Sequence, residues 1–169
     1  SFVGMHEVPI VYGLTIGEYA VMINEEGWLR NKMKTKLYVI ELKNYDRNQE
    51  FDLPIKPSPN LPNLKSVNLY PSLCLFEGTE ISIGRGTDFQ FQIYGSPNLD
   101  KEKNNFQFTP IKNSGSSYPK HENKICYGKN LTKTNRLQEL SLKYILNAYE
   151  DSSNKKDFFN NYFIKLAGV

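Results

Sequence analysis

The sequence has 169 residues, a formal net charge of only +3, and 13% aromatic residues. This charge is too small, and its basic residues too scattered, to indicate a surface for nucleic acid or anionic lipid. A mean hydropathy of −0.54 and the lack of an apolar run of about 18 residues argue against a membrane span and predict a globular chain that buries a core.

The first predicted elements are a strand, a helix and a second strand. They are expected at residues 8–11, 16–26 and 36–44. The helix has the strongest local signal, because Thr15 and Glu18 have the spacing of a capping box and Gly27 supplies a stop. The second strand has β-branched and aromatic residues at its centre, the composition that pleated sheets favour.

Residues 49–63 contain four prolines, which exclude a regular helix and predict a long, stiffened loop. Beyond it, strands are expected at 69–76, 89–94 and 106–109, a short ordered segment at 125–128, and helices at 135–149 and from 158 onward. The polar stretch 112–124 predicts an exposed loop. Together these elements predict an α+β architecture, a small mixed sheet with helices against it, in a single domain over residues 1–169.

The stretch 76–87 concentrates the polar groups on which a function could depend. It places Glu77 in a Glu-Gly-Thr turn and Arg85 between Gly84 and Gly86. Glycines on both sides of the arginine allow positive φ and the close approach of a ligand. The guanidinium offers five fixed donors to a carboxylate or a hydroxyl-rich partner. The alternative is a hairpin connection in which Glu77 and Arg85 pair with each other at the surface.

Other catalytic and metal-binding chemistries find little support in the sequence. It has no P-loop, no nucleophile elbow and no His/Cys spacing typical of a metal site, so neither a metal nor a cofactor is expected. His6 and His121 are interpreted as solvated residues, and Cys74 and Cys126 as buried thiols. Carboxylates remain for acid-base work, and glycoside hydrolysis needs two of them across a bond, with Glu77 the candidate that stands out.

Several short blocks follow one another in a recognisable order over about the first two-thirds of the chain. They are Ser1–Gly4, Pro9–Val11, Gly13–Glu18, Ile23–Asn24, Glu26–Leu29, Pro57–Pro62, Tyr70–Pro71, Phe76–Thr79 and Gly84–Thr87. Each block is weak by itself. As an ordered set they resemble the DUF1343 family, which is associated with exo-β-N-acetylmuramidases of the NamZ type.

The resemblance implies a bacterial cell-wall enzyme, exported to the periplasm or secreted, that releases N-acetylmuramic acid from non-reducing ends of peptidoglycan glycans. It also implies a Rossmann-like N-terminal domain and a C-terminal domain, with the active site in the cleft between them. The chain resembles the C-terminal part, so it is interpreted as a piece of a longer protein. The principal catalytic glutamate is then expected in the absent N-terminal domain, and this piece alone is expected to be inactive.

The resemblance assigns one side of the cleft to this chain. Glu77 and Arg85 are predicted as its catalytic groups. Contacts with the N-acetylmuramic acid glycan are predicted for Tyr12, Ser58, Asn60, Gly84, Gly86 and Thr87. Tyr12 stands where many relatives have a histidine, so the role of that histidine is not carried over. Glu80 stands where the family usually has asparagine, which argues against Glu80 as a shared catalyst.

Two alternatives belong to other functional classes. A glycan-binding or structural module without catalysis is supported by the aromatic content and by the incomplete catalytic set within the chain. A surface interaction domain is supported by the ordinary composition alone. It would gain if the 58–60 loop and the 84–87 turn lay on opposite faces. The predicted partners are the glycan and the N-terminal domain, without nucleic acid or membrane.

Overall fold

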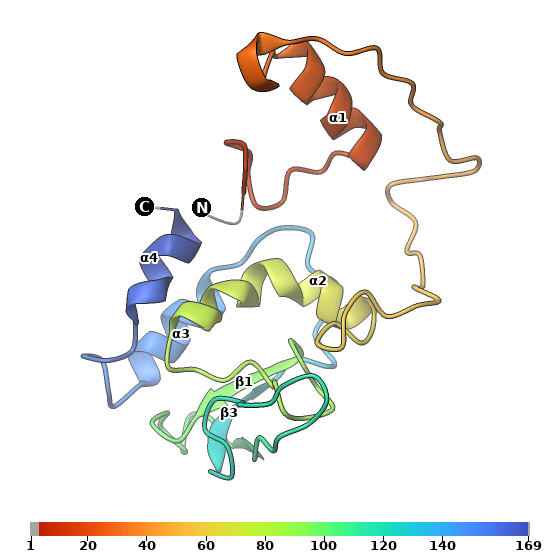
Figure 1. Cartoon of the computed structure of the whole chain (residues 1–169). Helices are drawn as coiled ribbons and strands as arrows, with labels where there is room; N and C mark the ends of the chain where they lie inside the picture. Colours follow the sequence, from red (N-terminus) through yellow and green to blue (C-terminus); the bar gives the residue numbers. More distant parts are fainter. Residues whose placement is uncertain (1–3, 169) are drawn as a thin grey trace. The chain divides into compact units, whose positions relative to one another are not determined.

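The computed structural model describes residues 4–168, whose contacts form two compact units (Figure 1). One unit comprises residues 4–51 and the other begins at Asp52, whereas the sequence analysis treats 1–169 as one domain. The helices are α1 (Ile16–Glu25), α2 (Leu64–Leu73), α3 (Lys143–Asp151) and α4 (Asn161–Ala167), with two 3-10 helices, η1 (Arg30–Lys32) and η2 (Cys74–Gly78). The strands are β1 (Ile93–Ser96), β2 (Phe106–Phe108) and β3 (Cys126–Asn130).

Helix α1 of the unit 4–51 forms as its local sequence predicts. The Glu18 amide donates to Thr15 Oγ1 over 3.2 Å, and the Thr15 amide donates to Glu18 Oε2 over 2.8 Å. Arg47 adds further hydrogen bonds to Glu18 and to the Gly13 carbonyl. Gly27 follows the helix with φ +68°. The capping box and the glycine stop are therefore confirmed.

The two strands predicted in the same unit are wrong. Residues 8–11 and 36–44 form no strand, and neither segment is buried. A strand requires a hydrogen-bonded neighbour, and the part of the chain that the structure describes offers none to 36–44. Asn24 is the one residue of this unit that is buried, where its side chain accepts from the Thr35 amide and donates to the Thr35 carbonyl.

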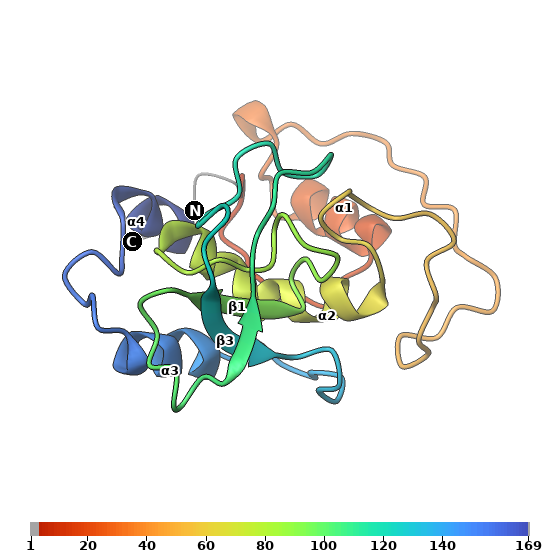
Figure 2. The same ribbon diagram turned by 90° about the horizontal axis from the view of Figure 1, so that it is seen from below.

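The unit from residue 52 onward is organised around a three-stranded sheet in the order β1-β3-β2. Tyr94 pairs with Lys129, and Gln107 pairs with Tyr127, with antiparallel direction in both cases. The architecture is α+β, as predicted, but these strands form an antiparallel sheet and not a mixed one. Helix α2 lies over one face of this sheet in both views (Figure 2).

The core of this unit lies where α2 and η2 meet the sheet and the C-terminal helices. Its members include Leu69, Leu73, Phe76, Ile81, Phe91, Tyr94, Tyr144, Ile145, Ala148 and Phe158. Phe76 stacks on Tyr94 with ring centroids 5.0 Å apart, which joins η2 to β1. The core thereby fixes the segment that carries Glu77 against the sheet.

The segment 69–76, predicted as a strand, is helical. Helix α2 begins at a second capping box, in which the Ser66 amide donates to Asn63 Oδ1 over 2.9 Å and the Asn63 amide donates to Ser66 Oγ over 3.3 Å. Leu69, Leu73 and Phe76 then recur at spacings of four and three, which places them on one buried face.

The remaining elements agree with the sequence to different degrees. Strand β2 forms at the predicted place, and the short ordered segment expected at 125–128 is part of strand β3. The strand expected at 89–94 begins only at Ile93, because Phe91 adopts φ +54° in the turn that precedes it. Helix α3 begins later than the predicted residue 135, since Leu137 is held by Asn68 from α2. Helix α4 begins at Asn161, whose predecessor Asn160 caps it.

Candidate functional site

Glu77 lies in η2, which continues directly from α2. The turn after it is closed by Thr79, whose hydroxyl donates to the Phe76 carbonyl over 2.8 Å. Gly78 allows α4 to approach, because a Cβ there would lie 2.5 Å from the Phe163 Cα. The glycine and threonine of the Glu-Gly-Thr motif are thus explained by packing, and the Glu77 side chain is left for another partner.

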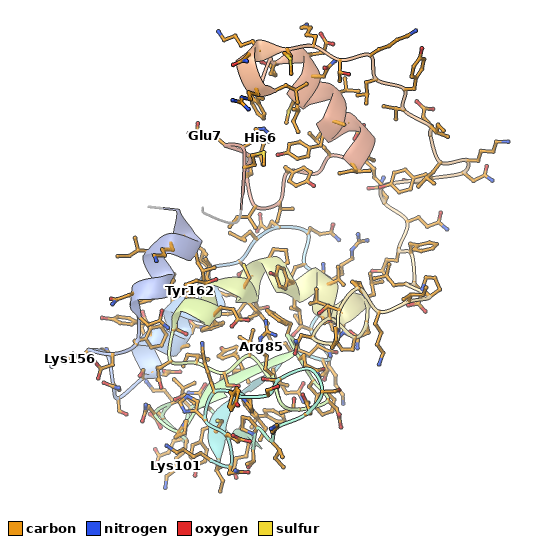
Figure 3. All side chains as sticks on the ribbon, in the orientation of Figure 1. His6, Glu7, Arg85, Lys101, Lys156 and Tyr162 are labelled. Atoms are coloured by element: carbon orange, nitrogen blue, oxygen red, sulfur yellow. The ribbon has the colours of Figure 1, made fainter. Side chains whose placement is uncertain are left out.

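That partner is Arg85. Its Nε and Nη2 donate to Glu77 Oε1 over 2.8 and 2.5 Å, and among residues 4–168 no hydrogen bond is made by Oε2. The side chains are 34% and 27% exposed for Arg85 and Glu77, so the ion pair is half-buried but reachable from solvent. The Arg85 guanidinium lies 5.3 Å from the centre of the Phe91 ring, which packs on Tyr70 of α2. In Figure 3, Arg85 lies between α2 and the sheet.

The glycines around Arg85 shape the turn that presents it. Gly84 and Gly86 have φ +78° and +79°. A Cβ at Gly84 would lie 2.6 Å from the Phe89 carbonyl oxygen, and one at Gly86 would lie 2.8 Å from that of Ile111. The Thr87 hydroxyl donates to the Gly84 carbonyl over 2.7 Å. Positive φ and close backbone packing both require glycine here, so these residues fix the position of Arg85 whatever ligand it meets.

A groove of about 530 Å³ opens beside this turn. Its lining includes Gly86, Thr87, Asp88, Phe89, Phe106, Phe108, Ile111 and Asn113. The Phe106 and Phe108 rings stack with centroids 6.0 Å apart, and the Phe89 side chain is exposed. The groove therefore combines apolar ring surfaces with hydrogen-bonding side chains next to two of the residues predicted to contact sugar.

Ser58 and Asn60 lie on the proline-rich loop, as predicted. The Asn60 amide group donates to the Gly115 carbonyl over 2.8 Å, and its backbone N–H donates to Ser58 Oγ over 3.1 Å. The Ile111 amide in turn donates to the Gly86 carbonyl over 2.8 Å. The loop 110–124 therefore holds both the proline-rich loop and the glycine turn, although the sequence analysis predicts it as merely exposed.

Lys120 is a functional candidate that no pattern in the sequence indicates. Its ammonium donates to the carbonyls of Phe76, Glu77, Thr79 and Ile81 over 2.9, 3.1, 2.6 and 3.3 Å. Burial lowers the pKa of Lys120 to about 8, with Arg85 acting in the same direction and Glu77 in the opposite one. A lysine in a polar loop is normally solvated, so its residue type and its position in the sequence gave no signal of this role.

His121 and Glu80 are parts of the scaffold next to this site. The His121 ring nitrogen Nε2 lies 2.6 Å from the Glu80 carbonyl oxygen, and its side chain is only 18% exposed, so the prediction of a solvated His121 is wrong. The Glu80 carboxylate accepts from Ser96 Oγ over 2.7 Å and from Asn98 Nδ2 over 2.8 Å. A carboxylate already bound by neighbouring side chains agrees with the expectation that Glu80 is not a catalyst.

Tyr12 lies in the other unit, within an aromatic cluster. Its ring centroid is 5.1 Å from that of Tyr19, whose hydroxyl lies 2.9 Å from His6 Nδ1. His6 stacks on Trp28 at 5.1 Å, so His6 is a packed residue and not the solvated one that was predicted. Tyr12 thus belongs to an aromatic cluster of the unit 4–51, whereas Glu77 and Arg85 belong to the other unit.

No metal site or membrane-spanning helix is found in residues 4–168. No three His, Cys, Asp or Glu side chains there converge as metal ligands. None of the helices described combines the length and the apolar character needed to cross a bilayer. Cys126 is buried, which raises the pKa of its thiol to about 12, and Cys74 is half-buried, so the predicted buried thiol is confirmed for Cys126.

Two models of the exo-beta-N-acetylmuramidase NamZ match the chain, the C-terminal model over residues 68–169 and the N-terminal model over residues 1–65. The chain belongs to the NamZ family. The N-terminal model thus covers residues that the sequence analysis assigns to the C-terminal domain. The family resemblance seen in the short sequence blocks is confirmed.

The relatives of this chain are longer than the chain itself. The peptidoglycan beta-N-acetylmuramidase NamZ of Bacillus subtilis (strain 168) is 35% identical over 149 residues, which cover 80% of this chain and 35% of that protein. A DUF1343 family protein of Bacteroides fragilis superposes with a TM-score of 0.89 at 43% identity, over all of this chain and 48% of its own. A second DUF1343 protein of the same organism has a TM-score of 0.77 at 21% identity over 98% of this chain and 48% of its own, which shows the fold alone.

Proposed function

We propose that this chain is part of a peptidoglycan-degrading glycoside hydrolase that releases N-acetylmuramic acid from the non-reducing ends of glycans. The unit from residue 52 onward lines one side of the active-site cleft, and the family's N-terminal domain supplies the other. The enzyme is exported from a bacterial cell, because its substrate lies outside the cytoplasm. Family membership supports this proposal, as does the similarity to the Bacillus subtilis relative, which is a peptidoglycan beta-N-acetylmuramidase.

The observation that carries the proposal is the ion pair of Glu77 with Arg85. Surface ion pairs on flexible side chains are common and contribute little. This pair is different because its guanidinium is held by a turn that only glycines allow, and its carboxylate by the η2 turn packed under α4. Two half-buried charges in fixed geometry are suited to bind a hydroxyl-rich ligand, since the cost of ordering them is already met by the fold.

The roles of the pair follow from its chemistry. Glycoside hydrolysis passes through a transition state with positive charge at the anomeric carbon, which a nearby carboxylate stabilises. Glu77 Oε2 is the oxygen that can face this charge or accept from a sugar hydroxyl. Arg85 keeps donors for a sugar oxygen or a carboxylate, such as that of the lactyl group of N-acetylmuramic acid. Both groups act beside a principal catalytic glutamate in the N-terminal domain.

The test is hydrolysis of a chromogenic β-N-acetylmuramic acid glycoside by the full-length protein. We expect Glu77→Gln and Arg85→Ala each to lower kcat/KM by about 100-fold or more, the scale of a charge-stabilising residue. Glu139→Gln, a carboxylate exposed on the same unit, serves as the matched control with unchanged turnover.

The same experiment decides between this proposal and a non-catalytic glycan-binding module. The groove beside Thr87, with its stacked Phe106 and Phe108 rings, favours the second function, because sugar rings pack on aromatic faces. Wild-type rates in both variants would mean that the catalytic groups lie outside this unit. The unit would then have a structural or a glycan-binding role. Absence of hydrolysis by the wild-type protein would reject the muramidase proposal.

A further inference from the structure

The loop 110–124 joins the three segments that carry the predicted site residues. Near its start, the Ile111 amide binds the Gly86 carbonyl, and at its centre the Gly115 carbonyl binds Asn60. Near its end, Lys120 reaches the η2 turn. One loop thus fixes the relative positions of the glycine turn, the proline-rich loop and the segment of Glu77.

The Lys120 ammonium is the strongest of these attachments. Its three N–H donors face four carbonyl oxygens of residues 76–81, two before and two after the Gly78 turn. The charged groups around it are Glu77 in η2, Glu80 after it, Arg85 in the glycine turn, and the neighbouring His121 when protonated. A hydrogen bond to a charged donor is about twice as strong as a neutral one, and burial strengthens it further.

These hydrogen bonds affect the shape of the turn that carries Glu77. The turn between Phe76 and Ile81 contains the backbone of Glu77, and its curvature brings four of its carbonyl oxygens toward one point, the Lys120 ammonium. Carbonyl dipoles that converge repel one another unless a cation lies between them. Without the ammonium the turn would open, and the Glu77 carboxylate would shift relative to Arg85.

We propose that Lys120 is a positioning residue, which holds the Glu77 backbone in the one conformation that lets the carboxylate meet Arg85 and the substrate. The inference rests on the proposed function, in which Glu77 acts on the glycan. Lys120 itself does not touch the substrate, because its donors are taken up by the turn.

The proposed role depends on the positive charge at position 120. A neutral amine has two donors and no charge, so it could not satisfy the four carbonyls that the ammonium binds. An arginine at position 120 keeps both the charge and several donors, so it is expected to replace the lysine in part.

The test uses the full-length protein with Lys120→Met, Lys120→Arg and the control Lys124→Met, an exposed lysine of the same loop. We expect Lys120→Met to lower kcat for the chromogenic glycoside by about 100-fold at pH 7, since small displacements of a catalytic group cost this much. Lys120→Arg recovers part of the activity, and Lys124→Met behaves as wild type.

A second measurement does not depend on activity. Amide hydrogen exchange in the peptide covering residues 74–82 is expected to accelerate in Lys120→Met, with unchanged exchange in β1 and β3. Unchanged exchange in this peptide, or a wild-type kcat in Lys120→Met, would overturn the positioning role. A wild-type protein that does not hydrolyse the glycoside would overturn the proposed function instead, while the exchange data still decide whether Lys120 holds the turn.

Discussion

The two compact units of this chain differ in how their apolar residues are used. The unit from residue 52 onward encloses Phe76, Phe158 and their neighbours completely. The unit 4–51 buries only Asn24, and it leaves Ile40 94% exposed together with most of its other large apolar side chains. The capping box marks where α1 begins, but apolar residues without a partner form no core. Exposed apolar residues in this density are typical of an interaction surface.

The family comparison agrees with this difference. The N-terminal model matches residues 1–65, and it therefore includes the whole of the unit 4–51. The chain covers only about a third of the Bacillus subtilis relative and half of the solved structures. The exposed apolar segment 36–44 is accordingly expected to pair as a strand with other residues of that N-terminal domain in the full-length protein.

The largest expected effect comes from separating the two units. Residues 52–169 produced alone are expected to unfold cooperatively on heating, because their core is complete within the unit. Residues 1–51 alone are expected to show no cooperative transition and a disordered NMR spectrum, since they bury almost no apolar area. Circular dichroism and amide chemical-shift dispersion check both outcomes. A cooperative transition in the 1–51 fragment would remove the contrast between the units.

Two alanine substitutions test the same comparison at single residues. Phe158→Ala in the 169-residue chain is expected to lower the free energy of unfolding by about 4 kcal/mol, because its ring is fully buried. Ile40→Ala is expected to change it by less than about 0.5 kcal/mol in the same chain. In the full-length protein we expect Ile40→Ala to cost about 2 kcal/mol or more, as a covered side chain would. Denaturant titration measures all three, and equal costs of Ile40→Ala in both lengths would contradict the covering.

The smallest expected effect is the pH dependence of α1. The Thr15 amide and the Arg47 guanidinium lower the pKa of Glu18 below its ordinary value of 4.5. Below pH 4.5 the Glu18 carboxylate therefore binds protons more readily in the unfolded chain than in the folded one. Its contribution to the stability of α1 is fully present above pH 4.5 and is lost as the pH falls through the pKa of Glu18 in the folded chain. Helical circular dichroism from α1 is expected to decrease over this range in wild type. In Glu18→Gln this part of the pH dependence is absent; if it persists, another group is responsible.

The candidate site shows where sequence reasoning succeeds and where it fails. Glu77 and Arg85 could be singled out because a charged residue beside glycines is a visible local pattern, and the structure does bring them together. Their roles stay predictions. Lys120 could not be found, because its carbonyl partners lie some forty residues earlier, in a turn whose shape the sequence did not predict. His121 was misjudged for the same reason.

The sequence by itself determined the features that depend on neighbouring residues. The capping box of α1 and the stop at Gly27 both follow from contacts within a few positions. Only the tertiary structure decided that 69–76 is helical, that 36–44 is unpaired, and that Lys120 binds the turn of Glu77. Strand pairing and the burial of a charge depend on which distant residues meet, and the free energy of those contacts outweighs local preference.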